Sequence, residues 1–339
     1  MIKKIIWCFL IAPFFCAAQN YSLKPLNQNT KTSLRGLNVV SNEVVWVSGS
    51  NGSVGKTTDG GLNWQWIKPK GYEKLDFRDI QAFDNQQAII VNAGSPAYIL
   101  KTVDGGETWT ESYKNLDSAI FLDGMSFWDK NKGIIFGDPI QNKMQLLKTT
   151  DAGKTWTDIS SKLKISLANG EAGFAASGTT IKTSAGGKVW IATGGMVSNI
   201  YYSADYGESW QAFKCPILQG ENSTGPFSMD FYTDKIGVVV GGNYVKDKEN
   251  SNNILLTNDG GKTWRKPQSP VYGYRSGVTY INSKTLIATG TSGTDVSTDG
   301  GNTWKHISDQ SFNAVQKASK GNLVILAGEK GAIYQLKIK

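Results

Sequence analysis

Six aspartates recur in one short motif, (S/T)-x-D-x-G-x-(T/S/N)-W, at intervals of 40 to 54 residues. Recurring carboxylates could bind a metal ion or act as acids. A Ca²⁺ site gathers about six to eight oxygen ligands, however, whereas each motif supplies one carboxylate. We therefore interpret each aspartate as the clasp of a tight turn and each tryptophan as a wedge between repeats. The residues are Asp59, Asp104, Asp151, Asp205, Asp259 and Asp299, followed by Trp64, Trp109, Trp156, Trp210, Trp264 and Trp304.

Arginine marks a second candidate site. The chain has four arginines, and three of them, Arg35, Arg78 and Arg275, stand at the start of similar strand patterns. In a lysine-rich chain, this reuse predicts that the three surround one opening, the mouth of a central channel. Their planar guanidinium groups could bind a carboxylate, a phosphate or an acidic peptide. Alternatively, each arginine pairs with a nearby carboxylate such as Asp79, Asp123 or Asp230 and only stiffens the channel.

Other reactive residues are few. We place Tyr274 and Asp79 at the same mouth, because an aromatic face near arginine can hold a peptide or a sugar. His306 is the only histidine, which argues against Ser-His-Asp catalysis and a histidine metal site. Cys215 is the one cysteine outside the first 16 residues. We predict no metal and no cofactor.

The motifs must be positioned by a repeated β unit. In the second repeat, residues 77–83 alternate, residues 88–92 form a continuous apolar run, and residues 98–102 lead into the aspartate motif. A fourth strand follows over residues 109–113. Four antiparallel strands per repeat are typical of one propeller blade.

The count of repeats predicts a closed ring. A seventh unit over residues 312–336 lacks the last strand, and residues 21–26 can supply it from the other end of the chain. The fold class is therefore all-β, a seven-bladed β-propeller of four-stranded antiparallel blades that the mature N-terminal strand closes. Six or eight blades remain alternatives if residues 165–182 are more than an irregular inner strand.

The first residues have the features of an export signal. Basic Lys3 and Lys4 precede an apolar run over residues 5–15, and small residues follow before Gln19. We expect residues 1–18 to be a signal peptide, residues 19–339 to form one propeller domain, and the protein to be periplasmic or extracellular. No other stretch has 18 apolar residues, so we expect no membrane span. The net charge of +8 is spread thinly, which argues against nucleic acid as a partner.

These motifs resemble Asp-box repeats, also called BNR repeats. The unit (F/L)-R-x-(I/L), then G-x-x-x-x-G, then T-x-D-G-G-x-T-W is similar to the photosystem II stability and assembly factor family and its non-photosynthetic bacterial relatives. The resemblance covers nearly the whole chain after residue 18. It implies seven blades, structural Asp boxes on the face away from the ligand site, and an arginine-rich patch that docks a partner.

Two functions follow from these observations. The first is a monomeric, non-catalytic binding or assembly propeller that docks an envelope protein, a secreted protein or an anionic ligand on its loop-rich face. The second is a sialidase-like glycoside hydrolase acting on anionic glycans, which would need an arginine triad, a Tyr–Glu nucleophile pair and an acid. Phe77-Arg78-Asp79-Ile80 only partly matches the F-R-I-P signature of sialidases.

Overall fold

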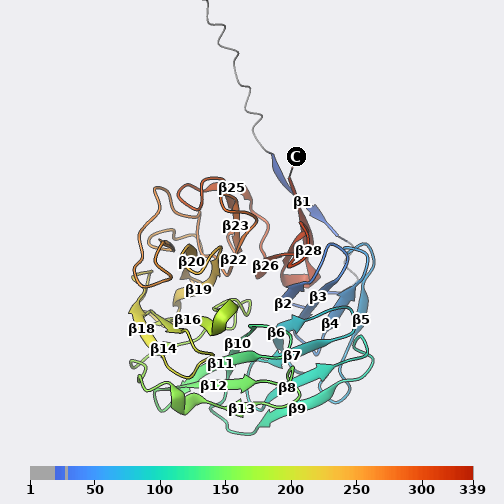
Figure 1. Ribbon diagram of the computed structural model, residues 1–339. Helices are drawn as coiled ribbons and strands as arrows, with labels where there is room; N and C mark the ends of the chain where they lie inside the picture. Colours follow the sequence, from blue (N-terminus) through green and yellow to red (C-terminus); the bar gives the residue numbers. More distant parts are fainter. Residues whose placement is uncertain (1–19, 27–29, 339) are drawn as a thin grey trace, which may run out of the picture.

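Seven antiparallel sheets surround a central channel in the computed structural model, which describes residues 20–26 and 30–338 (Figure 1). The predicted signal peptide lies outside the described residues. Each sheet is one blade, and its strands follow one another from the channel to the rim. The ring confirms the predicted seven-bladed all-β propeller.

Blades 1 to 3 have four strands each. Blade 1 has β2 (Leu34–Val39), β3 (Val45–Gly49), β4 (Val54–Thr57) and β5 (Gln65–Ile67). Blade 2 has β6 (Phe77–Ala82), β7 (Ala88–Asn92), β8 (Ala97–Thr102) and β9 (Thr110–Asn115). Blade 3 has β10 (Leu122–Phe127), β11 (Gly133–Ile140), β12 (Lys143–Thr149) and β13 (Thr157–Asp158), and the 3-10 turn η1 (Ser160–Lys162) follows it.

Blades 4 and 5 depart from the four-stranded plan. The inner strand of blade 4 is split into β14 (Glu171–Ala172) and β15 (Ile181–Ser184), and both pieces pair with β16. The irregular stretch near residues 165–182 is therefore an interrupted inner strand and adds no blade. The other elements are η2 (Ala185–Gly187), β16 (Lys188–Gly195), β17 (Asn199–Ser203) and β18 (Gln211–Lys214). Blade 5 has β19 (Thr224–Phe231), β20 (Gly237–Asn243) and β21 (Ile254–Thr257).

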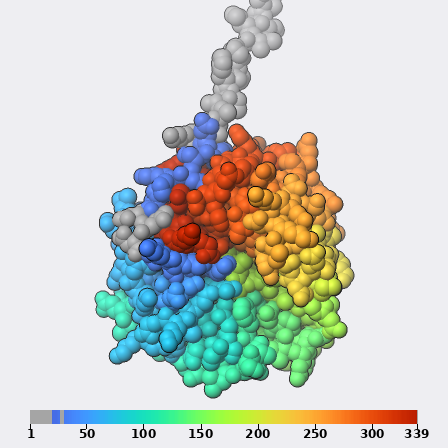
Figure 2. Space-filling model, turned by 180° about the vertical axis from the view of Figure 1, so that it is seen from behind, coloured from blue at the N-terminus to red at the C-terminus, as the bar shows by residue number. Residues whose placement is uncertain are grey.

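Blade 7 closes the ring with both ends of the described chain. Its outermost strand, β1, pairs antiparallel with β28, from Tyr21 opposite Ile338 to Pro25 opposite Tyr334. Figure 2 shows these blue and red segments side by side. The strands are β1 (Tyr21–Pro25), β26 (Ala314–Lys317), β27 (Val324–Ala327) and β28 (Ile333–Ile338), with η3 (Glu329–Gly331) before β28.

Blade 6 has β22 (Gly277–Tyr280), β23 (Leu286–Gly290), β24 (Gly293–Ser297) and β25 (Lys305–Ser308).

The core is a set of apolar clusters in the seams between blades. The continuous apolar strands predicted from the sequence, such as β7 and β20, are buried along their whole length. Each Asp-box tryptophan packs into the seam between its own blade and the preceding one: Trp109 joins the cluster of blades 1 and 2, and Trp264 that of blades 4 and 5. The tryptophans therefore hold neighbouring sheets together.

The Asp boxes form one repeated hydrogen-bond pattern. In the second box, Thr102 Oγ1 donates to Asp104 Oδ1 (2.8 Å) and accepts from Gly106 N (2.9 Å), while Thr108 N donates to Asp104 Oδ1 (3.0 Å). These bonds to the charged form lower the pKa of Asp104 to about 2, the side-chain bond from Thr108 first among them. Each carboxylate is thus fully occupied within its own turn.

Side chains also join the inner strands around the channel. Met125 N donates to Asp79 Oδ2 between blades 2 and 3, and Tyr280 N donates to Asp230 Oδ2 between blades 5 and 6. Gln316 Oε1 accepts from Val39 N across the closing seam. These bonds satisfy amides that point into the channel, where no further strand can pair with them.

Candidate functional site

A pocket opens at the end of the channel where the inner strands begin. We call it the channel-mouth pocket, and its volume is about 470 Å³. The Asp boxes lie at the opposite end of the blades, because Gly60 N donates to Glu43 O in the turn at the far end of β2. One face of the ring therefore carries the Asp-box turns, and the other carries the channel-mouth pocket.

A shared backbone irregularity aims side chains into this pocket. In blades 1, 2, 3 and 5 the pairing of the first two strands shifts by one residue, and the bulged residues are Arg35, Arg78, Asp123 and Phe227. All four line the pocket. A β-bulge re-aims one side chain out of the regular alternation, and here it places one residue per blade on a ring.

Arg35 and Arg78 hold this ring position in adjacent blades, and each has a partly exposed acidic partner. Arg35 Nη2 lies 3.5 Å from Glu329 Oε1, and Arg35 Nη1 lies 3.5 Å from Ala176 O. Arg78 Nε donates to Asp76 Oδ2 at 2.8 Å, and the Arg78 side chain is 34% exposed. Partly exposed pairs of this kind are worth about 0–1 kcal/mol. A ligand can therefore compete for both guanidinium groups.

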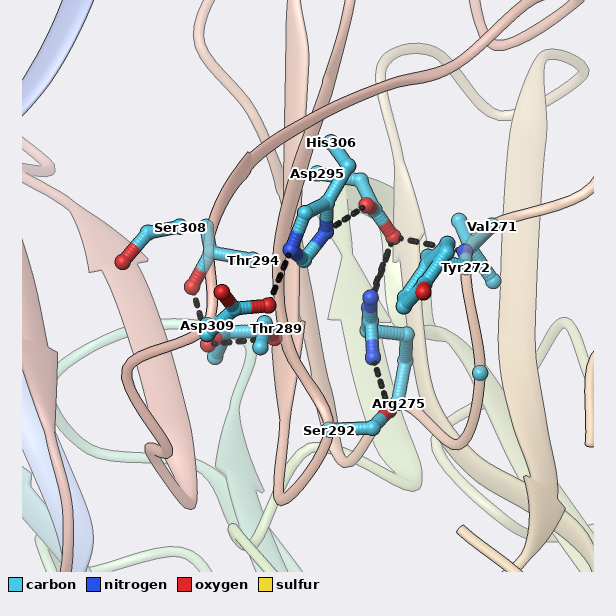
Figure 3. Close-up of polar contacts among 12 residues, drawn as sticks. Val271, Tyr272, Arg275, Thr289, Ser292, Thr294, Asp295, His306, Ser308 and Asp309 are labelled. Atoms are coloured by element: carbon cyan, nitrogen blue, oxygen red, sulfur yellow. Dashed lines mark hydrogen bonds and ion pairs between the residues drawn. The ribbon is translucent and has the colours of Figure 1, made fainter. Parts of the chain in front are cut away.

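Arg275 does not belong to this ring, which corrects the predicted cluster of three arginines. Its side chain is fully buried, and Arg275 Nε donates to the equally buried Asp295 Oδ2 at 2.8 Å (Figure 3). Nη1 donates to Tyr274 O and to Ser292 Oγ. Arg275 is therefore a structural residue inside blade 6.

The reason is a difference of one residue in register. Gly290 in blade 6 and Gly49 in blade 1 are equivalent glycines that lie against the start of the inner strand. A Cβ added to Gly290 would contact Tyr274 O and Arg275 Cα, and one added to Gly49 would contact Ser33 O and Leu34 Cα. Arg275 thus matches Leu34, which faces the core, and not Arg35. In a strand, a shift of one residue turns a side chain to the other face. Ser276 takes the ring position and lines the pocket.

Asp79 also lies away from the mouth. It directly follows the bulged Arg78, is 8% exposed, and lines a second, deeper cavity of about 250 Å³ in the channel. Its carboxylate accepts from Ile80 N and Met125 N. Burial nevertheless raises the pKa of Asp79 to about 8. The residue joins blades 2 and 3 and is not at the predicted partner site.

Tyr274 lies where the sequence placed it and forms part of an aromatic wall. The Phe174 and Phe227 rings stack with centroids 4.0 Å apart, and Tyr274 meets Phe227 edge-on at 4.8 Å. Tyr244 is 49% exposed at the rim and contacts both Phe227 and Tyr274. The pocket thus has an apolar side from blades 4 to 6 and a charged side from blades 7 and 1 to 3.

Two acids of the pocket were not predicted as ligand residues, since the sequence offered Asp123 only as a possible arginine partner and did not single out Asp138. Asp123 is 1% exposed, and neither of its carboxylate oxygens has a hydrogen-bond partner among the described residues. Asp138 accepts from Gly173 N at 2.9 Å, and burial raises its pKa. The repeat of the ring position in blade 3 is the signal that could have identified Asp123.

The residues that a sialidase would need are present but separated. Tyr201 OH donates to Glu171 Oε1 at 3.0 Å, which makes a Tyr–Glu pair. Both residues are 1–2% exposed, and neither lines the channel-mouth pocket. The pair fixes the split inner strand of blade 4. With Arg275 buried elsewhere, the described residues offer no arginine triad around it.

His306 sits between two carboxylates. Its Nδ1 lies 2.9 Å from Asp295 Oδ1, its Nε2 lies 3.0 Å from Asp309 Oδ1, and its ring lies beside Tyr272 (Figure 3). His306 is thus a partly buried member of the Arg275 network. Within residues 20–26 and 30–338, no three His, Cys, Asp or Glu side chains gather as a metal site, and no helix is long and apolar enough to cross a membrane.

Comparison with known proteins adds two family models. A model described as photosynthesis system II assembly factor YCF48 matches residues 73–213, and one described as sortilin, neurotensin receptor 3, matches residues 144–295. Each covers less than half of the chain. A search of curated proteins returned no match.

Solved structures resemble nearly the whole chain. YCF48 bound to D1 peptide is 16% identical with a TM-score of 0.65, covering 93% of this chain and 94% of that one. YCF48 from Cyanidioschyzon merolae is 15% identical with a TM-score of 0.65, covering 92% and 98%. The GH74 xyloglucanase from Xanthomonas campestris is 13% identical with a TM-score of 0.62, and the match spans 93% of this chain but 53% of the enzyme.

These findings agree with the repeated boxes and the seven blades. The chain is a BNR-type, or Asp-box, β-propeller that resembles the photosystem II assembly factors.

Proposed function

We propose that this propeller is a non-catalytic binding or assembly protein that docks an acidic polypeptide segment in the channel-mouth pocket. The observation that carries the proposal is the pair Arg35 and Arg78, which two adjacent blades present from the same bulged position. Both side chains line the pocket and have weak internal partners. Guanidinium groups in this arrangement suit a carboxylate, to which they can donate in pairs.

The opposite wall favours a polypeptide over a small inorganic anion. Phe174, Phe227 and Tyr274 form an apolar surface, and Tyr244 and Val245 are exposed beside it at 49% and 70%. An acidic side chain can bind the arginines while a neighbouring apolar residue packs on this wall. A solved YCF48 structure with a bound D1 peptide supports peptide docking on this fold.

A glycoside hydrolase is the second candidate. Asp123 and Asp138 place two carboxyl groups with raised pKa values in one pocket, and glycosidases use two carboxyl groups. The fold similarity to a GH74 xyloglucanase points the same way. Turnover of a fluorogenic panel of sialosides and neutral glycosides, lost in Asp123→Asn, would support it. No turnover at any pH from 4 to 9 would contradict it.

We also propose that the protein acts outside the cytoplasm, on the basis of residues 1–18. The basic start and the apolar run are those of an export signal. Cell fractionation of an epitope-tagged chain, with mass spectrometry of its mature N-terminus, tests the proposal. Recovery of uncleaved protein in the cytoplasm would contradict it.

Binding is tested with fluorescent peptides of matched length. We expect an acidic, amphipathic peptide to bind, and the double change Arg35→Gln with Arg78→Gln to weaken binding at least tenfold. Arg265→Gln is the control, because Arg265 is exposed and lies outside the pocket, and its guanidinium group donates only to Lys266 O and Asn302 Oδ1 among the described residues. Equal binding by the folded double variant would refute the arginine site.

A further inference from the structure

Asp123 is a buried acid without a partner that faces an open pocket. It holds the ring position in blade 3 that Arg35 and Arg78 hold in blades 1 and 2. It is 1% exposed, lines the channel-mouth pocket, and neither carboxylate oxygen is hydrogen-bonded within the described part of the chain. Buried polar groups almost always have partners, so an exception beside a pocket points to a partner from outside.

The surrounding chain leaves room for this side chain. A Cβ added to Gly173 would lie 2.3 Å from Asp123 Oδ2, so the glycine allows the carboxyl group to lie against the backbone. The same segment binds the second acid, since Gly173 N donates to Asp138 Oδ1. Gly173 thus leaves space for the Asp123 carboxyl group and donates to Asp138.

Charged neighbours face Asp123 from several elements. Asp138 on β11 and Arg78 on β6 act on it most directly. Burial raises the pKa of Asp123 well above its usual range and the charge of Asp138 raises it further, whereas Arg78 and the nearby backbone N–H of Asp138 act in the opposite direction. The remaining titratable side chains that line the pocket are Arg35, Glu329, Tyr244 and Tyr274.

We propose that Asp123 is a ligand-binding residue, and that its uncharged carboxyl group donates a hydrogen bond to a polypeptide carboxylate held by Arg35 and Arg78. This inference rests on the proposed function of the pocket. A protonated carboxyl group has one O–H donor, which matches a carboxylate oxygen. An ionised Asp123 would have only acceptors and would repel the same ligand.

The chemistry predicts a specific pH dependence. Over pH 6 to 9 an acidic ligand stays ionised and the arginines stay charged, so a fall in affinity within this range would report the ionisation of Asp123, whose pKa burial raises. Affinity is therefore expected to be highest at the acid end of this range and to fall by up to about tenfold per pH unit once Asp123 ionises, because binding requires the proton.

The test measures peptide affinity by fluorescence anisotropy at each pH unit from 6 to 9. One probe has a glutamate and an amidated end, and a second is neutral with a free C-terminus, so the two sources of a carboxylate are distinguished. In Asp123→Asn the side chain is uncharged and donates N–H at every pH. This variant is expected to bind like the wild type at pH 6 and to show no fall toward pH 9.

Two further variants complete the design. Glu107→Gln makes the same carboxyl-to-amide change at an exposed residue in an Asp-box turn and should keep the wild-type profile. Asp138→Asn separates the two acids: a pH dependence that only this variant removes would assign the titration to Asp138 and overturn the proposal. Should Asp123→Asn fail to fold, the carboxyl ¹³C shift of Asp123 in the wild type decides, and ionisation below pH 5 would refute it.

Failure of this inference differs from failure of the binding function. If the acidic probes bind and the double arginine variant loses them, but Asp123→Asn keeps the wild-type pH profile, only the role of Asp123 is overturned. If neither probe binds the wild type at any pH, the proposed function itself falls. A flat wild-type profile with intact binding also overturns the role of Asp123.

Discussion

Replacement of Arg275 by methionine is expected to destabilise the propeller without affecting its ligand site. The change leaves Asp295 buried, with only Tyr272 N and His306 as partners. The Arg275 and Asp295 side chains are 0% and 1% exposed, and Arg275 Nη2 lies 2.6 Å from Asp295 Oδ2. Removal of one partner from a buried pair costs about 3–5 kcal/mol, because the remaining charge is uncompensated.

The measurement is unfolding in urea, followed by tryptophan fluorescence at pH 7. Arg265→Met serves as the control, because Arg265 is exposed and surface changes usually stay within about 0.5 kcal/mol. Arg275→Lys should fall between the wild type and Arg275→Met, since lysine keeps the charge but cannot reproduce both the Nε and Nη2 contacts. Folded Arg275→Met should bind acidic peptide as the wild type does.

Two results would refute this reasoning. A free energy of unfolding within about 1 kcal/mol of the wild type would mean that Asp295 is not an uncompensated charge in the variant. A selective loss of peptide binding in a stable Arg275→Met protein would return Arg275 to the ligand site, contrary to its burial in blade 6.

Two other changes give independent checks. Asp104→Asn should lower the thermal midpoint at pH 7. The difference in midpoint from the wild type should shrink as the pH falls from about 4 toward the folded-state pKa of about 2, because a lowered pKa stabilises the fold only while the carboxylate is ionised. An equal difference at pH 7 and pH 2 would contradict this. Gly173→Ala should displace the Asp123 carboxyl group, because the new Cβ would lie 2.3 Å from Oδ2, and should lower the free energy of unfolding by about 1–3 kcal/mol. A crystal structure of the variant with Asp123 unmoved would contradict this.

The fold could be predicted from the sequence because its determinants are local. Six Asp boxes, each with its turn residues and tryptophan, mark the same place in each blade, and the alternating and continuous apolar runs identify the strands between them. The missing strand of the last unit and the spare strand at residues 21–26 predicted the closure that β1 and β28 form.

The site could be predicted only in part, because it depends on register and burial. Arg35 and Arg78 were placed at the channel mouth from their repeated position, and both line the pocket. Arg275 was misplaced, because the sequence does not show which residue of Tyr274-Arg275-Ser276 is aimed at the channel. Asp123 was not predicted at the channel-mouth pocket, because the burial of its carboxylate without a hydrogen-bond partner among the described residues is a tertiary property. A bulge moves one residue out of alternation, and only its recurrence at the same place in several blades could signal it.

The pairing of β1 with β28 makes closure of the ring a late step in folding. Tyr21 and Ile338 lie at opposite ends of the chain, so blade 7 cannot be completed until nearly all of the chain is available. Contacts between distant residues form slowly, because the intervening chain must first be ordered. Until then the edge of β28 and the seams of blades 6 and 7 stay open to other chains. Chaperone dependence during folding should therefore concentrate on this last blade.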